Sequence, residues 1–190
     1  MATTELYIKN MVCPRCIKVV RSLLEAEGLE VAKMELGKAS VNGQIDADKL
    51  NRLIPALQEE GFLLIDDKKQ QLVAAIKSII VDTVHYTDLD DMKENFSSLL
   101  SSRLQKDYHL LSSLFSELEG TTIEQYIIQQ KIEKVKELLR YNELSLSEIS
   151  YKLGYSSVAH LSAQFKKVTG LTPSQFRQTK DTGRIPLDKI

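Results

Sequence analysis

The spacing of apolar residues divides the chain into a mixed first third and a helical remainder. In residues 1–67, stretches of alternating polar and apolar residues are typical of half-buried strands. Between them, two stretches have apolar residues at every third or fourth position, which is typical of helices. The predicted order is strand 5–9, helix 14–27, strands 29–34 and 39–41, a helix from Asp46 or Asp48 to Gly61, and strand 62–65. This βαββαβ order predicts a split β-α-β sandwich of the ferredoxin-like type.

A long helix is predicted over residues 69–85. Leu72, Ile76, Ile79 and Thr83 fall close to a heptad spacing on it. Two interpretations are open. The helix packs on a neighbouring domain, or it forms the seam of a homodimer.

From about residue 92 onward the pattern is helical throughout. Six helices are predicted, over residues 92–104, 107–118, 122–141, 146–153, 157–169 and 173–179. The fold class is therefore α+β. The expected division is a ferredoxin-like domain at 1–67, a connecting helix at 68–90, an all-α double helix-turn-helix domain at 91–180 and a loose tail at 181–190.

The clearest local motif lies near the end of the chain. A short helix over 146–153, a turn at Gly154 and a second amphipathic helix over 157–167 have the helix-turn-helix layout. Apolar residues of both helices are expected to hold the pair together, namely Ile149, Leu153, Leu161 and Phe165. The opposite face of the second helix would then be free to enter a DNA major groove.

The runs from Gly154 to Ser157 and from Phe165 to Arg177 resemble the second helix-turn-helix of AraC-type regulators. The similarity reaches back to about residue 92, and residues 122–141 resemble the helix that joins two such units. The resemblance implies sequence-specific binding of double-stranded DNA and regulation of transcription. The positions it assigns to DNA contact are Ser157, Val158, Ala159, His160, Ala163, Gln164, Lys166 and Lys167.

The recognition face departs from that family at one position. Many relatives have an arginine where Ala163 stands. His160 is therefore expected to read a base edge, while Val158 and Ala159 contact thymine methyl groups. The alternative for His160 is a surface position without a DNA contact. Lys166 and Lys167 are expected to lie near phosphates.

A first helix-turn-helix unit is weaker in the sequence. His109, Ser112 and Ser113 align with its recognition positions, but the glycine-aromatic turn before them is missing. Glu117 and Glu119 stand in the segment where the family carries a basic pair. Since each lost cation removes a phosphate contact, this unit is expected to contribute little DNA affinity.

Two cysteines, Cys13 and Cys16, form a C-x-x-C motif at the start of the first helix. A helix N-terminus favours thiolates, and two thiolates suit soft ions such as Cu(I) and also Zn(II). With the βαββαβ order and Met11 and Phe62, residues 1–67 resemble the heavy-metal-associated domain, from which Asn10 and other positions depart. Three roles remain open for the C-x-x-C motif: binding of a metal ion, a thiol redox switch, or no chemistry at all in a fold that serves only protein interactions.

Charge and composition fit this division. Residues 1–67 carry eight Lys/Arg and eleven Asp/Glu, whereas residues 121–190 carry eleven and seven. The basic excess therefore lies at the end that holds the DNA-binding motif. No long apolar run, secretory signal or catalytic motif is visible. We therefore expect a cytoplasmic protein that is not an enzyme, does not bind a membrane and has no small-molecule substrate.

Three functions remain at this point. The first is a regulator that responds to a soft metal ion or to thiol redox state through Cys13 and Cys16. The second is a thiol or metal-binding protein, such as a metallochaperone, whose helical half binds protein partners. The third is a DNA-binding regulator whose N-terminal domain senses no ligand. Sequence-specific DNA binding separates the second from the other two.

Overall fold

The computed structural model describes residues 3–90, 92, 94–179 and 183–190. Its N-terminal part has the predicted βαββαβ order, and its four strands form one antiparallel sheet in the order β2-β3-β1-β4. The strands are β1 (Thr3–Lys9), β2 (Val31–Glu35), β3 (Lys38–Asn42) and β4 (Leu63–Ile65).

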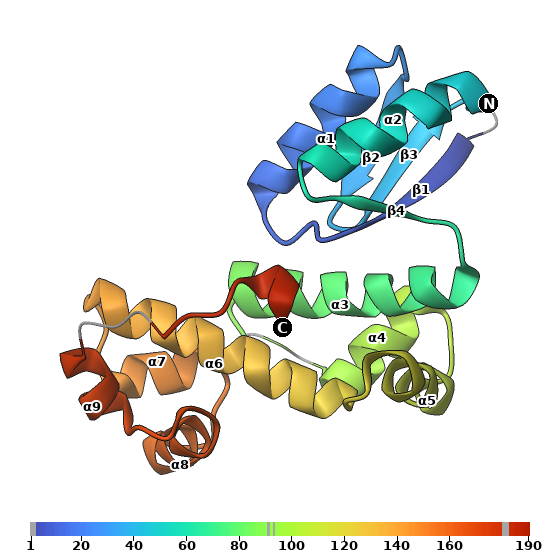
Figure 1. Ribbon diagram of the computed structural model, residues 1–190. Helices are drawn as coiled ribbons and strands as arrows, with labels where there is room; N and C mark the ends of the chain where they lie inside the picture. The colour runs from blue at the N-terminus through green and yellow to red at the C-terminus, as the bar shows by residue number, and fades with distance from the viewer. Residues whose placement is uncertain (1–2, 91, 93, 180–182) are drawn as a thin grey trace.

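Two helices, α1 (Pro14–Ala26) and α2 (Ala47–Glu59), cover one face of this sheet (Figure 1). Asp46 begins α2 by accepting a hydrogen bond from the Lys49 amide at 2.7 Å, which satisfies one free N–H of the first turn. The apolar faces of helices and sheet meet in a core whose fully buried members include Ile8, Val20, Leu24, Val41, Leu53 and Leu57.

The rest of the chain is helical, as predicted. Its helices are α3 (Lys68–Tyr86), α4 (Phe96–Leu104), α5 (Tyr108–Glu119), α6 (Ile123–Tyr141), α7 (Leu146–Lys152), α8 (Val158–Thr169) and α9 (Pro173–Gln178), followed by the short 3-10 helix η1 (Leu187–Lys189). The fold class is therefore α+β, with a sheet domain first and an all-α domain after it.

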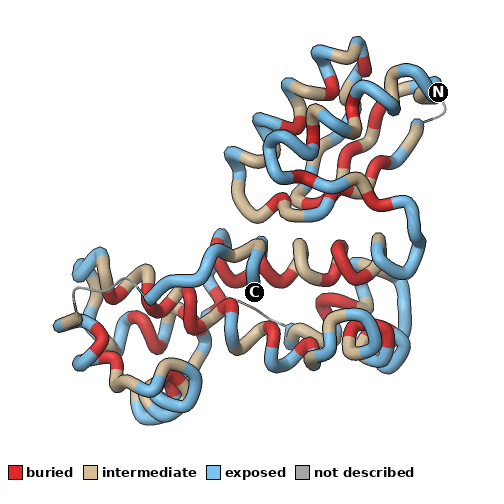
Figure 2. Tube along the Cα trace, viewed as in Figure 1, coloured by how far each residue is buried: buried red, intermediate tan, exposed pale blue. Residues whose placement is uncertain are grey.

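Helix α3 is part of the helical domain's core. Val73, Ile76, Ile80 and Val84 are almost fully buried in one apolar cluster with residues of α4 to α9. Figure 2 shows buried positions along α3 where it lies against the other helices. Of the two interpretations of this helix, packing on a neighbouring domain holds. The second interpretation, a homodimer seam along the same helix, stays a prediction.

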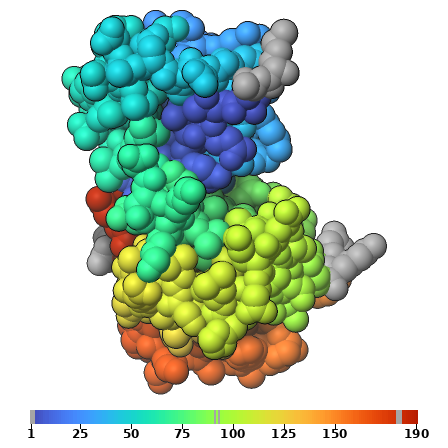
Figure 3. Space-filling model, turned by 90° about the vertical axis from the view of Figure 1, so that its right-hand side faces the viewer, coloured from blue at the N-terminus to red at the C-terminus, as the bar shows by residue number. Residues whose placement is uncertain are grey.

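The N-terminal domain rests on the other side of α3, so the two domains lie one above the other with α3 between them (Figure 3). The β2–β3 turn makes a close contact there. A Cβ added to Gly37 would lie 2.3 Å from Ser78 Oγ, and Gly37 has a φ of +78°. Both the contact and the left-handed backbone therefore require glycine.

The end of the chain was expected to be a loose tail. Residues 183–190 instead lie along α6 and α3. The Lys136 ammonium donates to the Gly183 carbonyl oxygen, the Ile185 amide donates to Glu133 at 3.0 Å, and Lys77 donates to Ile190 at 3.0 Å. Residues 181 and 182 of the expected tail lie outside the described residues.

The Gly37 contact leads to a stability prediction. Gly37→Ala should lower the free energy of unfolding through both backbone strain and the clash with Ser78. Gly43→Ala is the matched control, because Gly43 has a φ of +82° but nothing within 4 Å of an added Cβ. The control should lose about 1–2 kcal/mol from the backbone alone, and Gly37→Ala more, in urea unfolding. Equal losses would mean that the Gly37 contact does not hold the domains together.

Candidate DNA-binding surface and cysteine pair

The second helix-turn-helix is formed by α7 and α8. Ser145 and Glu148 cap α7 reciprocally: the Glu148 amide donates to the serine hydroxyl, and the Ser145 amide donates to the glutamate. Gly154 makes the turn with a φ of +63°, and Ser157 begins α8 by accepting a hydrogen bond from the His160 amide at 3.1 Å. These local signals are why the motif could be read from the sequence.

The inner face of α8 fixes the helix to the domain. Leu161 and Phe165 are fully buried, and the Phe165 ring packs edge-on against Phe176 of α9 at 5.4 Å. Ile149 and Leu153 of the preceding segment are buried against them, as predicted. The opposite face of α8 is consequently turned outward.

The residues assigned to DNA contact divide into two groups on this helix. Exposed side chains are Ser157, Ala159, His160, Ala163, Lys166 and Lys167, whereas Val158 and Gln164 are half-buried. Gln164 accepts a hydrogen bond from the Tyr155 hydroxyl at 2.8 Å. This bond holds the Gln164 side chain against the turn and occupies its amide oxygen, so that mainly the amide nitrogen is available to contact a base.

His160 also has neighbours within the protein. Its Nδ1 lies 3.1 Å from Ser156 Oγ, and its ring meets the Tyr155 ring edge-on at 5.4 Å. These contacts hold the ring in one orientation. The other ring nitrogen, Nε2, makes no hydrogen bond with the described residues.

The first unit, α4 and α5, keeps the helix-turn-helix shape without its usual glycine. Gln105 adopts the left-handed conformation, with a φ of +51°, and its amide donates to Ser101 O. His109 and Ser113 are exposed and Ser112 is half-buried. In Figure 1, α5 and α8 lie on the side of the helical domain that faces away from the sheet domain.

The two carboxylates of α5 are held by lysines of α3. Glu119 lies 3.0 Å from Lys77 and Glu117 lies 3.7 Å from Lys69. These contacts direct the carboxylates toward α3. They therefore anchor the end of α5, a role that the sequence did not reveal.

Most cations of the helical domain's second half are engaged inside the protein. Those with partners are Lys131, Lys134, Lys136, Arg140, Lys152, Arg177 and Arg184. Lys166 and Lys167 make no hydrogen bond or ion pair with the described residues, and both are exposed at the end of α8. The positive charge offered to a ligand is therefore concentrated there.

The cysteine pair lies at the start of α1. The Sγ atoms of Cys13 and Cys16 are 3.2 Å apart, and both residues are half-buried. Met11 and Phe62 lie in the core of the same domain, 2% and 6% exposed. Asn10 has a φ of +74°, a conformation that glycine adopts freely and asparagine tolerates.

The environment separates the two thiols. Burial opposes ionisation of Cys13, but hydrogen bonds from the Cys16 thiol and from the backbone amides of Cys16 and Arg15, with the Arg15 charge, hold the pKa of Cys13 below its ordinary value. Burial and the neighbouring Cys13 raise the pKa of Cys16. Cys13 is therefore the more easily ionised of the two thiols, and thiolates are the form that binds metal ions and attacks disulfides.

The donor set at this pair consists of the two sulfurs alone. Among the residues that the structure describes, no group of three or more His, Cys, Asp and Glu side chains is placed to hold a metal ion. Two sulfurs fit a soft ion that accepts few ligands. Zn(II) in structural sites takes four ligands, so it would need two more from outside the described chain.

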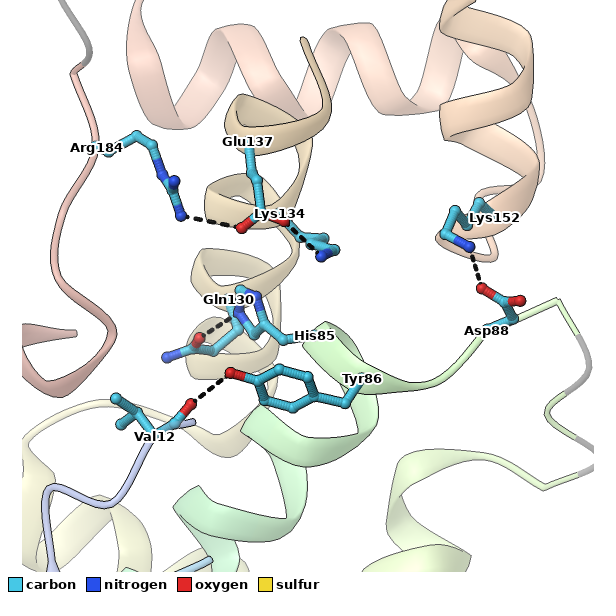
Figure 4. A network of polar contacts seen from close by, with 9 residues as sticks. All are labelled: Val12, His85, Tyr86, Asp88, Gln130, Lys134, Glu137, Lys152 and Arg184. Carbon is cyan, nitrogen blue, oxygen red and sulfur yellow. Dashed lines mark hydrogen bonds and ion pairs between the residues drawn. The ribbon is translucent and has the colours of Figure 1, made fainter. Parts of the chain in front are cut away.

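The end of α3 connects the cysteine loop with the helical domain (Figure 4). The Tyr86 hydroxyl donates to the Val12 carbonyl oxygen at 2.9 Å. His85 Nε2 lies 2.9 Å from Gln130 Oε1 on α6, and Asp88 forms an ion pair with Lys152 at the end of α7. Three neighbouring residues thus contact three different parts of the molecule.

Two helix-turn-helix units joined by one long helix define a DNA-binding module. Residues 100–179 match the family model described as a helix-turn-helix domain. The Msm operon regulatory protein of Streptococcus mutans is 27% identical over 139 residues, which are 73% of this chain and 49% of that protein. The HTH-type transcriptional activator RhaR of Cronobacter sakazakii is 38% identical over 68 residues, 36% of this chain and 24% of that protein.

Among solved structures, the C-terminal domain of AraT, a response regulator from Geobacillus stearothermophilus, has the same fold. The TM-score is 0.51 at 24% identity, over 60% of this chain and 89% of that one. The helical part of the chain is an AraC-type helix-turn-helix domain, a module found in DNA-binding transcription regulators.

The similarities cover only part of this chain and only part of its relatives. The family match begins at residue 100 and so leaves the sheet domain without an assigned family. The chain also spans about half the length, or less, of the curated relatives just named.

In the described residues, no helix is both long and apolar enough to cross a membrane.

His85 should make stability depend on pH. Burial, with the nearby Lys134 and Arg184 charges, lowers the pKa of His85, although Gln130 and Glu137 oppose this. The unfolded state therefore binds a proton as pH falls below about 6.5 while the folded state stays neutral. The free energy of unfolding of the wild type, relative to His85→Gln, should fall between pH 7.5 and 5.5, by at most about 1.4 kcal/mol per pH unit. A constant difference would contradict this.

The free lysines of α8 should determine DNA affinity. Lys166→Glu or Lys167→Glu should abolish specific binding in a gel-shift assay with DNA selected from a random pool by the wild type. Lys167→Gln should lower the salt dependence of log K by about one unit, because one phosphate contact is lost.

Variants elsewhere test whether α8 is the main reader. Lys18→Glu, on the exposed face of α1, is the charge-matched control and should bind DNA normally. Alanine at His109, Ser112 or Ser113 should have little effect. A larger loss from these three than from the α8 lysines would make the assignment of the second unit wrong.

Proposed function

We propose that the protein is a sequence-specific DNA-binding transcription regulator whose DNA affinity responds to a soft metal ion or to thiol redox state at Cys13 and Cys16. One observation carries the sensing part of this proposal. The loop that bears the two sulfurs, 3.2 Å apart, is hydrogen-bonded to α3, a helix of the DNA-binding domain's own core. A change at the sulfurs therefore has a direct physical path into that domain.

Cu(I) is the metal that the donor set supports best. Soft thiolates select soft ions, and the pair supplies two sulfurs without a third protein ligand among the described residues. When bound, Cu(I) would displace the remaining protons of the two thiols, so that the ion and its two thiolates would together carry a single net negative charge. Cys13 and Cys16 would hold it, and the Val12, Arg15 and Cys16 amides would stabilise the sulfurs.

Thiol oxidation is the second way in which the same pair could act. A disulfide between Cys13 and Cys16 removes two protons and two electrons, which an oxidised thiol such as glutathione disulfide would accept. The lowered pKa of the Cys13 thiol favours attack by this residue. Both routes change the bonding at the same two atoms.

The deciding experiment measures DNA affinity and sulfur state in the same samples. The full chain is titrated with Cu(I) under anaerobic conditions, or poised with reduced and oxidised glutathione, and its Kd for a selected DNA fragment is followed by fluorescence anisotropy. We expect a shift of about fivefold or more between the two states, in the usual range for coupled sites. Cys13→Ser with Cys16→Ser should abolish the shift and keep the melting temperature and the DNA affinity of the reduced, metal-free protein.

The other outcomes point to the alternatives. A protein that binds Cu(I) but no DNA sequence selectively would be a metallochaperone or thiol protein whose helical half binds partners. Selective DNA binding that is the same in every sulfur state would indicate a regulator whose sheet domain senses no ligand.

A further inference from the structure

Tyr86, the last residue of α3, reaches the cysteine loop from the helical domain (Figure 4). Its hydroxyl donates to the carbonyl oxygen of Val12, the residue that directly precedes Cys13. Burial and then the charges of Cys13 and Cys16 raise the pKa of Tyr86 to about 12. The phenol therefore remains a neutral hydrogen-bond donor close to both sulfurs.

Val12 is joined directly to the cysteine pair. Its carbonyl group, which accepts the Tyr86 hydrogen bond, belongs to the peptide bond with Cys13, and its backbone amide helps to lower the pKa of Cys16 against the effect of burial. A shift of the loop that follows a change at the sulfurs therefore alters the geometry at the Val12 carbonyl. Hydrogen bonds weaken steeply with misalignment, which makes the Tyr86 contact sensitive to such a shift.

The surroundings leave room for that movement. A cavity of about 230 Å³ lies between the domains, lined by Met11 and Val12 of the loop and by Lys77, Ser78 and Val81 of α3, among others. Close-packed interiors resist displacement, whereas a loop beside a void can move without forcing its neighbours apart.

The residues after Tyr86 contact the DNA-reading unit. Asp88 pairs with Lys152, the last residue of α7, and the Leu89 amide donates to the Lys152 carbonyl oxygen at 3.1 Å. Leu89 also packs on Gly154, where an added Cβ would lie 3.4 Å from the Leu89 carbonyl oxygen. Gly154 lies in the turn that sets the direction of α8.

We propose that Tyr86 is the positioning residue through which the second helix-turn-helix senses the state of the cysteine pair. The path runs from the cysteine pair through the adjoining Val12 carbonyl to Tyr86, and from Asp88 and Leu89 to the end of α7. The two states differ in whether the Tyr86–Val12 hydrogen bond is made, which gives each state of the sulfurs a different affinity for DNA. This inference rests on the proposed function.

The test uses Tyr86→Phe, which removes the hydroxyl and keeps the ring. We measure the ratio of DNA Kd values with and without Cu(I), and the Cu(I) affinity by competition with a chromogenic chelator. The wild-type ratio, about fivefold or more, should shrink toward one by about threefold or more, as the loss of one hydrogen bond allows, while Cu(I) affinity stays within about twofold. Tyr7→Phe is the matched control, because it removes a hydroxyl that donates to the exposed Glu5 and has no part in the proposed path.

A second measurement needs no metal. In the reduced, metal-free protein, the Leu89 amide should exchange its hydrogen faster in Tyr86→Phe than in the wild type or Tyr7→Phe. The reason is that the hydrogen bond from the Leu89 amide to the Lys152 carbonyl oxygen should open more often once Tyr86 no longer holds the preceding residues. Where Tyr86→Phe lowers the melting temperature by more than a few degrees, Lys152→Met interrupts the same path beyond α3. It should also shrink the Kd ratio.

The outcomes separate this inference from the proposed function. A wild type that responds to Cu(I), with an equal response in Tyr86→Phe and Lys152→Met, overturns the role of Tyr86 and leaves the function intact. A wild type that does not respond to Cu(I) or to oxidation overturns the function. An unchanged exchange rate at Leu89 then overturns the path as well.

Discussion

The burial of α3 on two sides is the constraint on which the rest of the structure depends. Val73, Ile76, Ile80 and Val84 fill the core of the helical domain, while Ala74 and Val81 line the cavity beside the sheet domain. A helix that is apolar on most sides must be covered on most sides. This requirement places the sheet domain against the DNA-binding domain and brings the cysteine loop to the end of the same helix.

Most basic side chains of the helical domain's second half are paired within the protein. The cations of α6 and of the C-terminal segment pair with carboxylates and carbonyl groups of the same domain, and Lys136 with Glu133 is almost completely buried. Since an unpaired buried charge is costly, these contacts fix the C-terminal segment along α6. The basic charge of the described residues in the last third of the chain is thus mostly engaged within the protein, whereas Lys166 and Lys167 on α8 are exposed and make no ion pair with the described residues.

The same division explains the difference between the two helix-turn-helix units. The first keeps its shape although Gln105 must adopt a left-handed conformation, and its carboxylates contact lysines of α3. It is thereby tied to the helix that also supports the sheet domain. The second unit contacts the segment after α3 through Lys152 and Gly154, so its position depends on the residues that follow Tyr86.

The sequence by itself determined the elements and their order, because capping residues, glycines and apolar spacing act over a few neighbouring positions. The start of α2 near Asp46, the turn at Gly154 and the buried face of α8 could all be predicted in this way. So was the proximity of Cys13 and Cys16, since a C-x-x-C motif at a helix start brings its sulfurs together. The outward face of α8 followed from the same periodicity.

Only the tertiary structure decided which partners the distant residues find. The apolar stripe of α3 is compatible with a dimer seam or with a domain core, and periodicity cannot choose between them because both bury the same residues. The pairing of Glu119 with Lys77, the course of residues 183–190 and the bond between Tyr86 and Val12 join positions up to 113 residues apart. Such contacts depend on how the two domains dock, which is set by the whole buried surface and not by any local pattern.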